Sequence, residues 1–184
     1  MHPQSIQSNA RQAGLSLIEM LIVLSILGIV LGFALPAMGQ FGERQRVVAA
    51  HNQLLASFSQ ARMQAIVARA PTVVCPSVDG RQCAAGGVWE AGWISFIDRN
   101  RNGTLDAIDT LLQHENIGVD GLRVRSSVGR PALNFLADGR SPGSNLTLKL
   151  CGEDQRPLGA IIVNNTGRAR HAEAAELATM SSCS

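Results

Sequence analysis

Two arginines near the C-terminal end of the chain have the residue type and spacing that suit phosphate binding. They stand in the run Gly167-Arg168-Ala169-Arg170, directly after the turn-forming residues 164–166. Arginines two positions apart on an extended strand point the same way, and a guanidinium can hold a phosphate through two parallel hydrogen bonds. The pattern predicts contacts with adjacent phosphates of a nucleic-acid backbone. Two surface arginines in a turn can equally have no ligand at all.

Four more arginines could extend this surface: Arg123, Arg125, Arg130 and Arg140. From residue 122 onward the chain has eight basic and five acidic side chains, whereas residues 98–120 have two basic and five acidic ones. This segregation favours an anionic partner for the C-terminal part, although the net charge of the chain is only +2. Because aromatic residues are scarce, we expect binding through phosphates that is independent of sequence and strongly dependent on salt. An ordinary solvated face is the alternative.

The segment from Asp98 to Asp109 has the spacing of a calcium-binding loop. Oxygen-bearing side chains stand at its first, third, fifth, ninth and twelfth positions, with Gly103 at the sixth, as in an EF-hand. These side chains are Asp98, Asn100, Asn102, Asp106 and Asp109. Two arginines lower the negative charge, and no helical pattern flanks the segment. A plain hairpin loop, for which Asn-Gly is typical, explains the same residues, so calcium is the alternative prediction.

Catalysis has no support in the sequence. None of the four histidines stands in a motif that would place a nucleophile beside it. The glycine-rich pieces lack the pattern of a nucleotide-binding loop. We therefore predict that the protein is not an enzyme and, calcium apart, needs no cofactor.

A long apolar run precedes these arginines and the segment at 98–109 in the chain and is long enough to anchor them to a membrane. The 21 residues from Leu15 to Leu35 contain one ionisable side chain, that of Glu19. As a helix they would extend about 31 Å, enough to cross the core of a bilayer. A carboxylate there costs about 3 kcal/mol or more, so it needs a partner. An ordinary secretory signal would instead have a shorter apolar core, with its cleavage site after that core.

All four cysteines follow the apolar run: Cys75, Cys83, Cys151 and Cys183. An even number on the exported side of a membrane suggests two disulfides. Three pairings are possible, and the sequence alone does not choose among them. Proximity along the chain favours Cys75 with Cys83 and Cys151 with Cys183.

After the apolar run the hydrophobic pattern indicates one amphipathic helix and then strands. Residues 43–69 have apolar side chains at helical spacing with arginine and glutamine between them, and Pro71 ends the pattern. Gly, Asn and Asp then separate short apolar segments. The predicted strands are 72–75, 92–97, 122–126, 146–151 and 158–163, with weaker candidates at 111–115 and 133–136. We predict an α+β protein in which an antiparallel β-sheet packs on the second half of a long helix.

The N-terminal segment resembles the type IV pilin and pseudopilin superfamily. The residues that carry the resemblance are Gly14, the apolar run after it, and Glu19, five positions beyond Gly14. The resemblance implies that a prepilin peptidase cuts between Gly14 and Leu15 and that Leu15 is then methylated, although the family usually has phenylalanine there. It also implies that Glu19 pairs with the N-terminal amine of a neighbouring pilin during assembly of a filament.

Over nearly its full length the sequence resembles the FimT/GspH branch of minor pilins and pseudopilins. The matching stretches are residues 61–66, 93–98 and 166–168. The resemblance implies a leader at 1–14, a helix at 15–70 that spans the inner membrane over 15–36, and a β-rich domain at 71–184 with two disulfides. It places that domain in the periplasm and then, within a pilus, at the cell surface.

In FimT-type minor pilins a Gly-Arg-x-Arg motif near the C-terminus is implicated in DNA binding, and Gly167, Arg168 and Arg170 match it. The resemblance therefore implies a minor type IV pilin that binds double-stranded DNA non-specifically for uptake in natural transformation. The alternative is a purely structural subunit, either a minor pseudopilin of a type II secretion system or a pilin that primes assembly.

Overall fold

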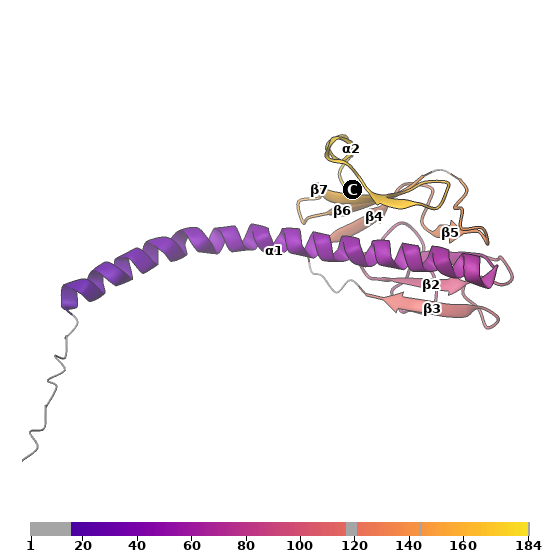
Figure 1. The fold of residues 1–184 in the computed structure, drawn as a ribbon, viewed down its shortest axis with the longest axis horizontal. Helices are drawn as coiled ribbons and strands as arrows, with labels where there is room; N and C mark the ends of the chain where they lie inside the picture. The colour runs from indigo at the N-terminus through magenta and orange to yellow at the C-terminus, as the bar shows by residue number, and fades with distance from the viewer. Residues whose placement is uncertain (1–15, 117–120, 144, 184) are drawn as a thin grey trace, which may run out of the picture. The chain divides into compact units, whose positions relative to one another are not determined.

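One long helix begins in the N-terminal part of the protein and continues into the rest. A computed structural model describes residues 16–116, 121–143 and 145–183, without the side chains of residues 33–41, and divides into two compact units, residues 1–41 and 42–184. Helix α1 (Leu17–Ala68, Figure 1) begins in the first unit and ends in the second. Glu19 lies in its first turn. Its described apolar side chains up to residue 32 are exposed.

The predicted membrane segment is only partly described. Among the described residues no helix is long and apolar enough to cross a membrane. Gly14 and Leu15, the residues on either side of the predicted cleavage site, lie outside the described residues, and so do the side chains of the last part of the predicted 15–36 span. Insertion of this segment into a membrane therefore stays a prediction.

In the second unit, α1 is amphipathic, as its sequence predicts. Its buried side chains recur every three or four residues, which places them on one face. The apolar ones are Val47, Ala50, Leu54, Phe58, Ala61 and Ala65, and His51 and Ser57 are buried beside them. The helix ends at Ala68, where Arg69 takes a left-handed backbone conformation with φ of 51° and Pro71 follows two residues later. A proline cannot continue the helix, so the chain turns here into the first strand.

Two antiparallel four-stranded sheets follow the helix. The first has the order β3-β2-β1-β5 and the second the order β4-β6-β7-β8. The strands are β1 (Thr72–Pro76), β2 (Trp93–Ile97), β3 (Thr110–Glu115), β4 (Arg123–Ser126), β5 (Leu133–Phe135), β6 (Leu146–Cys151), β7 (Pro157–Val163) and β8 (Ala169–His171). The α+β class is confirmed, and the seven predicted strands are present. The strand β8 and the short helix α2 (Ala174–Ala178) were not predicted.

The core lies between α1 and both sheets. It contains Trp89 and Trp93, and the indole nitrogen of Trp93 donates a hydrogen bond of 3.0 Å to the hydroxyl of Ser57 on α1. A second, smaller cluster covers the other face of the first sheet and includes Ile94 and Phe96, with Leu105 packed against it. Strands β1 and β2 are therefore buried on both faces, whereas β4 and β8 keep exposed residues.

Two disulfides join Cys75 to Cys83 and Cys151 to Cys183, which is the pairing that proximity favours. The second bond holds the C-terminal tail on β6, and Lys149 adds hydrogen bonds from its Nζ to the carbonyl oxygens of Ser181 and Ser182. A cross-link between residues 32 positions apart stabilises a fold by about 3–4 kcal/mol in the chain-entropy treatment. The tail after α2 is therefore fixed to the second sheet.

Candidate nucleic-acid interface

The turn that carries the predicted phosphate-binding motif joins β7 to β8. Its backbone is held by Asn164, whose side-chain oxygen accepts hydrogen bonds from the N–H of Arg168 (3.0 Å) and the hydroxyl of Thr166 (2.7 Å). Gly167 takes φ of 77° and donates its N–H to the carbonyl of Asn164. The side chain of Arg168 is exposed and has no hydrogen bond or ion pair with any described residue. Its guanidinium is therefore available to an external anion.

A second turn, which contains Gly139, packs against the turn that contains Gly167. A Cβ atom on Gly167 would overlap the carbonyl oxygen of Gly139, so the two backbones approach more closely than any other residue type allows. The N–H of Ser141 also donates to the carbonyl of Asn165 at 3.1 Å. The glycine of the motif is thus required by packing, and it sets the position of Arg168 beside it.

Arg62 of α1 fixes both turns to the helix. Its Nε donates to the carbonyl of Gly139 at 2.9 Å, and its Nη2 donates to the carbonyl of Thr166 at 3.2 Å. The sequence pattern predicts only that Arg62 lies on the polar side of the helix. Its carbonyl partners lie 77 and 104 positions away, and that long-range contact leaves no sign in the local sequence.

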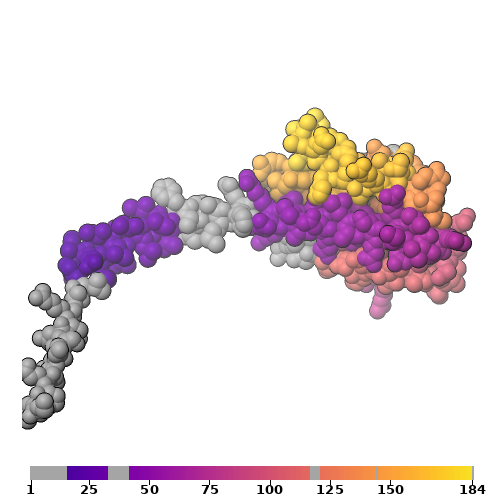
Figure 2. All heavy atoms as spheres, in the orientation of Figure 1, coloured from indigo at the N-terminus to yellow at the C-terminus, as the bar shows by residue number. Residues whose placement is uncertain are grey.

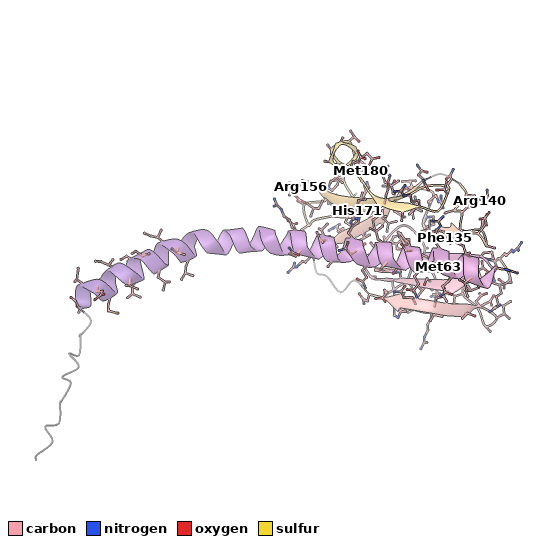
Figure 3. All side chains as sticks on the ribbon, in the orientation of Figure 1. Met63, Phe135, Arg140, Arg156, His171 and Met180 are labelled. Carbon is pink, nitrogen blue, oxygen red and sulfur yellow. A yellow bond between two sulfur atoms is a disulfide. The ribbon has the colours of Figure 1, made fainter. Side chains whose placement is uncertain are left out.

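Arg62 and Arg168 line one groove between α1 and the turn. The groove has a volume of about 490 Å³, and its other lining residues are Phe58, Ser59, Met63, Ile66, Gly167 and Ala169. Two arginines and no acidic residue therefore line this space. Figure 2 shows the C-terminal residues, in yellow, lying against the helix, and Figure 3 labels Met63, an exposed residue that lines the groove. A positively charged groove with an apolar floor suits an anion that also has apolar surface.

The second arginine of the motif already has an anionic partner. On β8, Arg170 makes two hydrogen bonds of 2.7 Å to the two carboxylate oxygens of Glu176 on α2. This contact and the backbone N–H of Glu173 lower the pKa of Glu176 to about 2. Arg168 and Arg170 are therefore not equivalent, because only Arg168 is without a carboxylate.

A histidine pair lies beside the motif. The rings of His51 on α1 and His171 on β8 have centroids 3.9 Å apart (His171 is labelled in Figure 3), and Nε2 of His51 is 3.2 Å from the carbonyl oxygen of Ala160. Burial, followed by the charge of His171, lowers the pKa of His51. The pair joins the edge strand that bears Arg170 to the helix that bears Arg62.

Comparison with known proteins identifies the family of this chain. Residues 50–167, more than half of the chain, match a family model described as type II transport protein GspH. The chain belongs to the GspH family. Residues 9–35 match the prokaryotic N-terminal methylation motif. The protein is thus a type IV minor pilin or pseudopilin, a class of subunits that assemble with other pilins, and the motif implies processing by a prepilin peptidase and anchoring in a membrane.

Solved structures support the fold of this GspH-family protein. The type IV minor pilin FimU of Pseudomonas aeruginosa is 19% identical, with a TM-score of 0.60 over 78% of this chain and 99% of FimU. The minor pseudopilin EpsH of the type II secretion system of Vibrio cholerae is 13% identical, with a TM-score of 0.50 over 70% of this chain and 97% of EpsH. At these identities the similarity establishes the fold alone. Among curated proteins, none matches the chain significantly.

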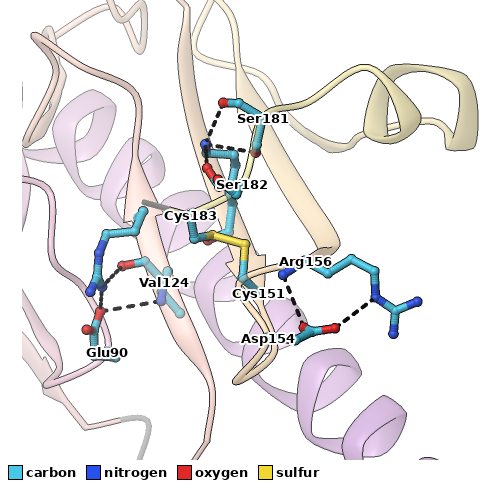
Figure 4. Close-up of a disulfide and its surroundings, with 10 residues drawn as sticks. Glu90, Val124, Cys151, Asp154, Arg156, Ser181, Ser182 and Cys183 are labelled. Atoms are coloured by element: carbon cyan, nitrogen blue, oxygen red, sulfur yellow. Dashed lines mark hydrogen bonds and ion pairs between the residues drawn. A yellow bond between two sulfur atoms is a disulfide. The ribbon is translucent and has the colours of Figure 1, made fainter.

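Two of the other predicted arginines of this GspH-family protein, Arg123 and Arg125, lie on a different strand from the motif. Strand β4, which bears Arg123 and Arg125, and strand β8 form opposite edges of the second sheet. The guanidinium of Arg125 is paired with Glu90, which Figure 4 labels beside Val124. Two strands therefore separate β4 from β8, and the extension of the patch to Arg123 and Arg125 stays a prediction.

The two remaining arginines of the predicted patch lie closer to the motif. Arg140, in the turn that supports Gly167, is paired with Asp138 at 2.6 Å. Arg130 is half-buried and donates a hydrogen bond to the hydroxyl of Ser141, and burial lowers its pKa. Each of these two side chains is engaged within the protein, whereas Arg168 is open and lines the groove together with Arg62, a residue outside the predicted surface.

The loop predicted as a calcium site uses its carboxylates for its own backbone. Asp98 accepts hydrogen bonds from the N–H groups of Asn102 and Gly103, and Asp109 accepts from those of Arg99 and Asp106. In the described part of the chain, no three His, Cys, Asp or Glu side chains come together as a metal site would require.

A third carboxylate of this loop is engaged in the same way. The N–H of Ile108, followed by the amide of Asn100, lowers the pKa of Asp106. Calcium binding would require these carboxylates to leave their backbone partners. It stays a prediction, which isothermal titration with calcium would test.

Proposed function

We propose that this protein is a minor type IV pilin that binds double-stranded DNA for uptake in natural transformation. The proposal depends on one observation: the groove beside the β7–β8 turn presents Arg62 and Arg168 and no carboxylate. Guanidinium groups at the surface bind phosphate oxygens, which are the same along any DNA sequence. Binding would therefore be non-specific and would weaken steeply as salt increases.

The N-terminal unit would deliver this surface to the outside of the cell. Cleavage between Gly14 and Leu15 and methylation of Leu15 would prepare the subunit in the inner membrane. In the filament, Glu19 would pair with the N-terminal amine of a neighbouring pilin inside an apolar bundle, where an unpaired charge is costly. The sheet domain, periplasmic at first, would then face outward in the pilus, and no catalytic step is part of this role.

A purely structural role is the second candidate. Much of the positive charge near the motif is engaged within the protein, since Arg170 pairs with Glu176 and Arg140 pairs with Asp138. A minor pseudopilin of a type II secretion system, or a pilin that primes assembly, would contact other pilins and need no DNA. The two roles differ in one property that can be measured, which is the contribution of Arg168 to DNA binding.

A mobility-shift titration with the full chain in detergent tests the proposal. Labelled double-stranded DNA would be titrated at low and at moderate salt with the wild type and with Arg168→Gln. Arg123→Gln is a matched control, because Arg123 is also exposed and without a partner among the described residues, but it lies at the opposite edge of the sheet. We expect Arg168→Gln to weaken binding about tenfold, or about 1.4 kcal/mol, and Arg123→Gln to weaken it less than twofold.

Two results would overturn the proposal in favour of the structural role. One is the absence of binding at low salt by a folded chain with both disulfides intact. The other is an equal effect of the two substitutions, which would mean that the affinity reflects overall charge and not this groove.

A further inference from the structure

We propose that Glu176 is a specificity-determining residue of the DNA interaction, because its carboxylate occupies the position at Arg170 that a phosphate would take. Isolated anions would then bind poorly, and only a polyanion already held at Arg168 would displace the carboxylate. This inference rests on the proposed function. It gives a reason why, in one Gly-Arg-x-Arg motif, Arg168 has no carboxylate partner while Arg170 is paired with Glu176.

The geometry of the contact is that of a bound anion. Nη1 and Nη2 of Arg170 each donate a hydrogen bond of 2.7 Å to a different oxygen of Glu176. This two-oxygen, planar arrangement is the one by which a guanidinium recognises either a carboxylate or a phosphate. Nη1 also donates to the carbonyl of His171, which holds the guanidinium in place on β8. A phosphate could therefore replace the carboxylate without a change in the strand.

The contact is accessible to such a replacement. The side chains of Arg170 and Glu176 are 42% and 36% exposed. An exposed ion pair contributes little to stability and can exchange readily with another anion. Helix α2, which bears Glu176, has no buried residue. The carboxylate can therefore leave Arg170 without exposing any part of the core.

The carboxylate is nevertheless a strong competitor because it is tethered. Glu176 lies six positions from Arg170, and the tail beyond α2 is fixed by the Cys151–Cys183 disulfide and by Lys149. A tethered group acts at an effective concentration in the millimolar range. A free phosphate at lower concentration would not displace it. DNA bound at Arg168 would present its next phosphate as a tethered competitor of the same kind, so the two would compete on equal terms.

Substitution of Glu176 by glutamine tests this inference. Glutamine keeps an oxygen that can accept the hydrogen bond of 2.8 Å that Glu176 receives from the N–H of Glu173, so the start of α2 is preserved. Glu173→Gln is the matched control, because it removes one negative charge from the same helix end but no hydrogen-bond partner of Arg170. The assay is the same mobility-shift titration with the full chain, extended to several salt concentrations.

We expect Glu176→Gln to increase the affinity for DNA about three- to tenfold and to steepen the dependence on salt by about one counterion. Glu173→Gln should change the affinity less than twofold. Inorganic phosphate should compete with DNA at a lower concentration in Glu176→Gln than in the wild type. These results together would establish that Glu176 closes Arg170 to single anions.

A second substitution keeps the inference testable if α2 does not fold in Glu176→Gln, a point that circular dichroism would check. In the wild type, Arg170→Gln should weaken binding less than twofold, whereas Arg168→Gln weakens it about tenfold. In the Glu176→Gln background the two arginine substitutions should have similar effects. An Arg170→Gln effect in the wild type as large as that of Arg168→Gln would overturn the inference.

The remaining outcomes separate the inference from the proposed function. If the wild type binds DNA through Arg168 and Glu176→Gln behaves like Glu173→Gln, only the inference is overturned. If neither the wild type nor Glu176→Gln binds DNA at low salt, both are overturned.

Discussion

The loop at residues 98–109 and the turn at residues 164–168 both contain two asparagines and at least one charged side chain, yet the charged side chains have opposite roles. In the loop, Asp98 and Asp109 accept hydrogen bonds from backbone N–H groups. In the turn, the neutral Asn164 accepts those hydrogen bonds, and the charged Arg168 is left outside. A charged side chain is available to a ligand only where another residue holds the backbone.

The two regions also differ in how they are attached to the protein. The loop is held by its own hydrogen bonds and by Leu105, which packs on the second hydrophobic cluster. The turn is held by its own Asn164 and also from outside, by Arg62 of α1 and by contact with Gly139. Changes within the loop should therefore alter stability, whereas changes in or beside the turn should alter DNA binding.

The largest effect on stability should come from Asp98→Ala in the loop. Asp98 is 3% exposed and accepts hydrogen bonds from the N–H groups of Asn102 and Gly103, which would lose their partner. We expect a loss of about 3 kcal/mol in the free energy of unfolding, measured with denaturant. DNA binding by the folded variant should be unchanged. Asp154→Ala, at an exposed carboxylate that also accepts a backbone N–H, should cost less than about 1 kcal/mol and is the control.

A reduced DNA affinity in folded Asp98→Ala would contradict the division between a stabilising loop and a DNA-binding turn, because it would assign a binding role to the loop. A loss in stability no larger than that of Asp154→Ala would contradict the structural role that its hydrogen bonds imply.

A smaller loss in stability, together with weaker DNA binding, should follow from Gly167→Ala in the turn. The new Cβ would meet the carbonyl oxygen of Gly139, and φ of 77° is unfavourable for alanine. We expect about 2 kcal/mol in stability and a several-fold lower DNA affinity, because the shift would move Arg168. Gly129→Ala is the control, with φ of 81° and no atom within 4 Å of the added Cβ. Only the loss beyond that control measures the contact between the two turns.

The helix, the seven strands and the fold class could be predicted from the sequence because their signals are local. Apolar residues at intervals of three and four mark the buried face of α1, and short apolar segments between glycines mark the strands. Strand β8 was missed because three residues with Arg170 and His171 among them have no apolar alternation. Helix α2, with five residues and no buried side chain, has no periodic signal either.

For the candidate site, the sequence indicates the residue types but not which of the arginines have partners within the protein. The residue types of the motif favour phosphate binding, but whether each guanidinium is open depends on its neighbours in space. The partner of Arg125 is 35 positions away and the carbonyl partners of Arg62 are 77 and 104 positions away. Such contacts follow from the strand order and not from local spacing, and the strand order also separates Arg123 from Arg168.

The smallest expected effect is a pH dependence of stability that should distinguish the two regions. Beside the turn, burial lowers the pKa of His51 below its usual value of 6.5, so the unfolded chain takes up a proton more readily. Stability should be complete above about pH 6.5 and fall as pH decreases toward the folded pKa. In the loop, the pKa of Asp106 lies below its usual 3.8, so its contribution is present above that value and is lost only at more acidic pH.

Between pH 7 and pH 5 the loss in the free energy of unfolding should therefore come from His51, beside the turn. For one proton it amounts to at most about 1.4 kcal/mol per pH unit. His51→Gln removes the titration and keeps a donor for the carbonyl of Ala160, so its free energy of unfolding should depend less on pH than that of the wild type. The difference between the two profiles isolates His51 from the other histidines. Equal profiles would contradict this assignment, because they would place the pH-sensitive group away from the strand that bears Arg170. Amide exchange that accelerates in residues 160–171 and not in residues 98–109 on acidification would show that β8 is the element that loosens.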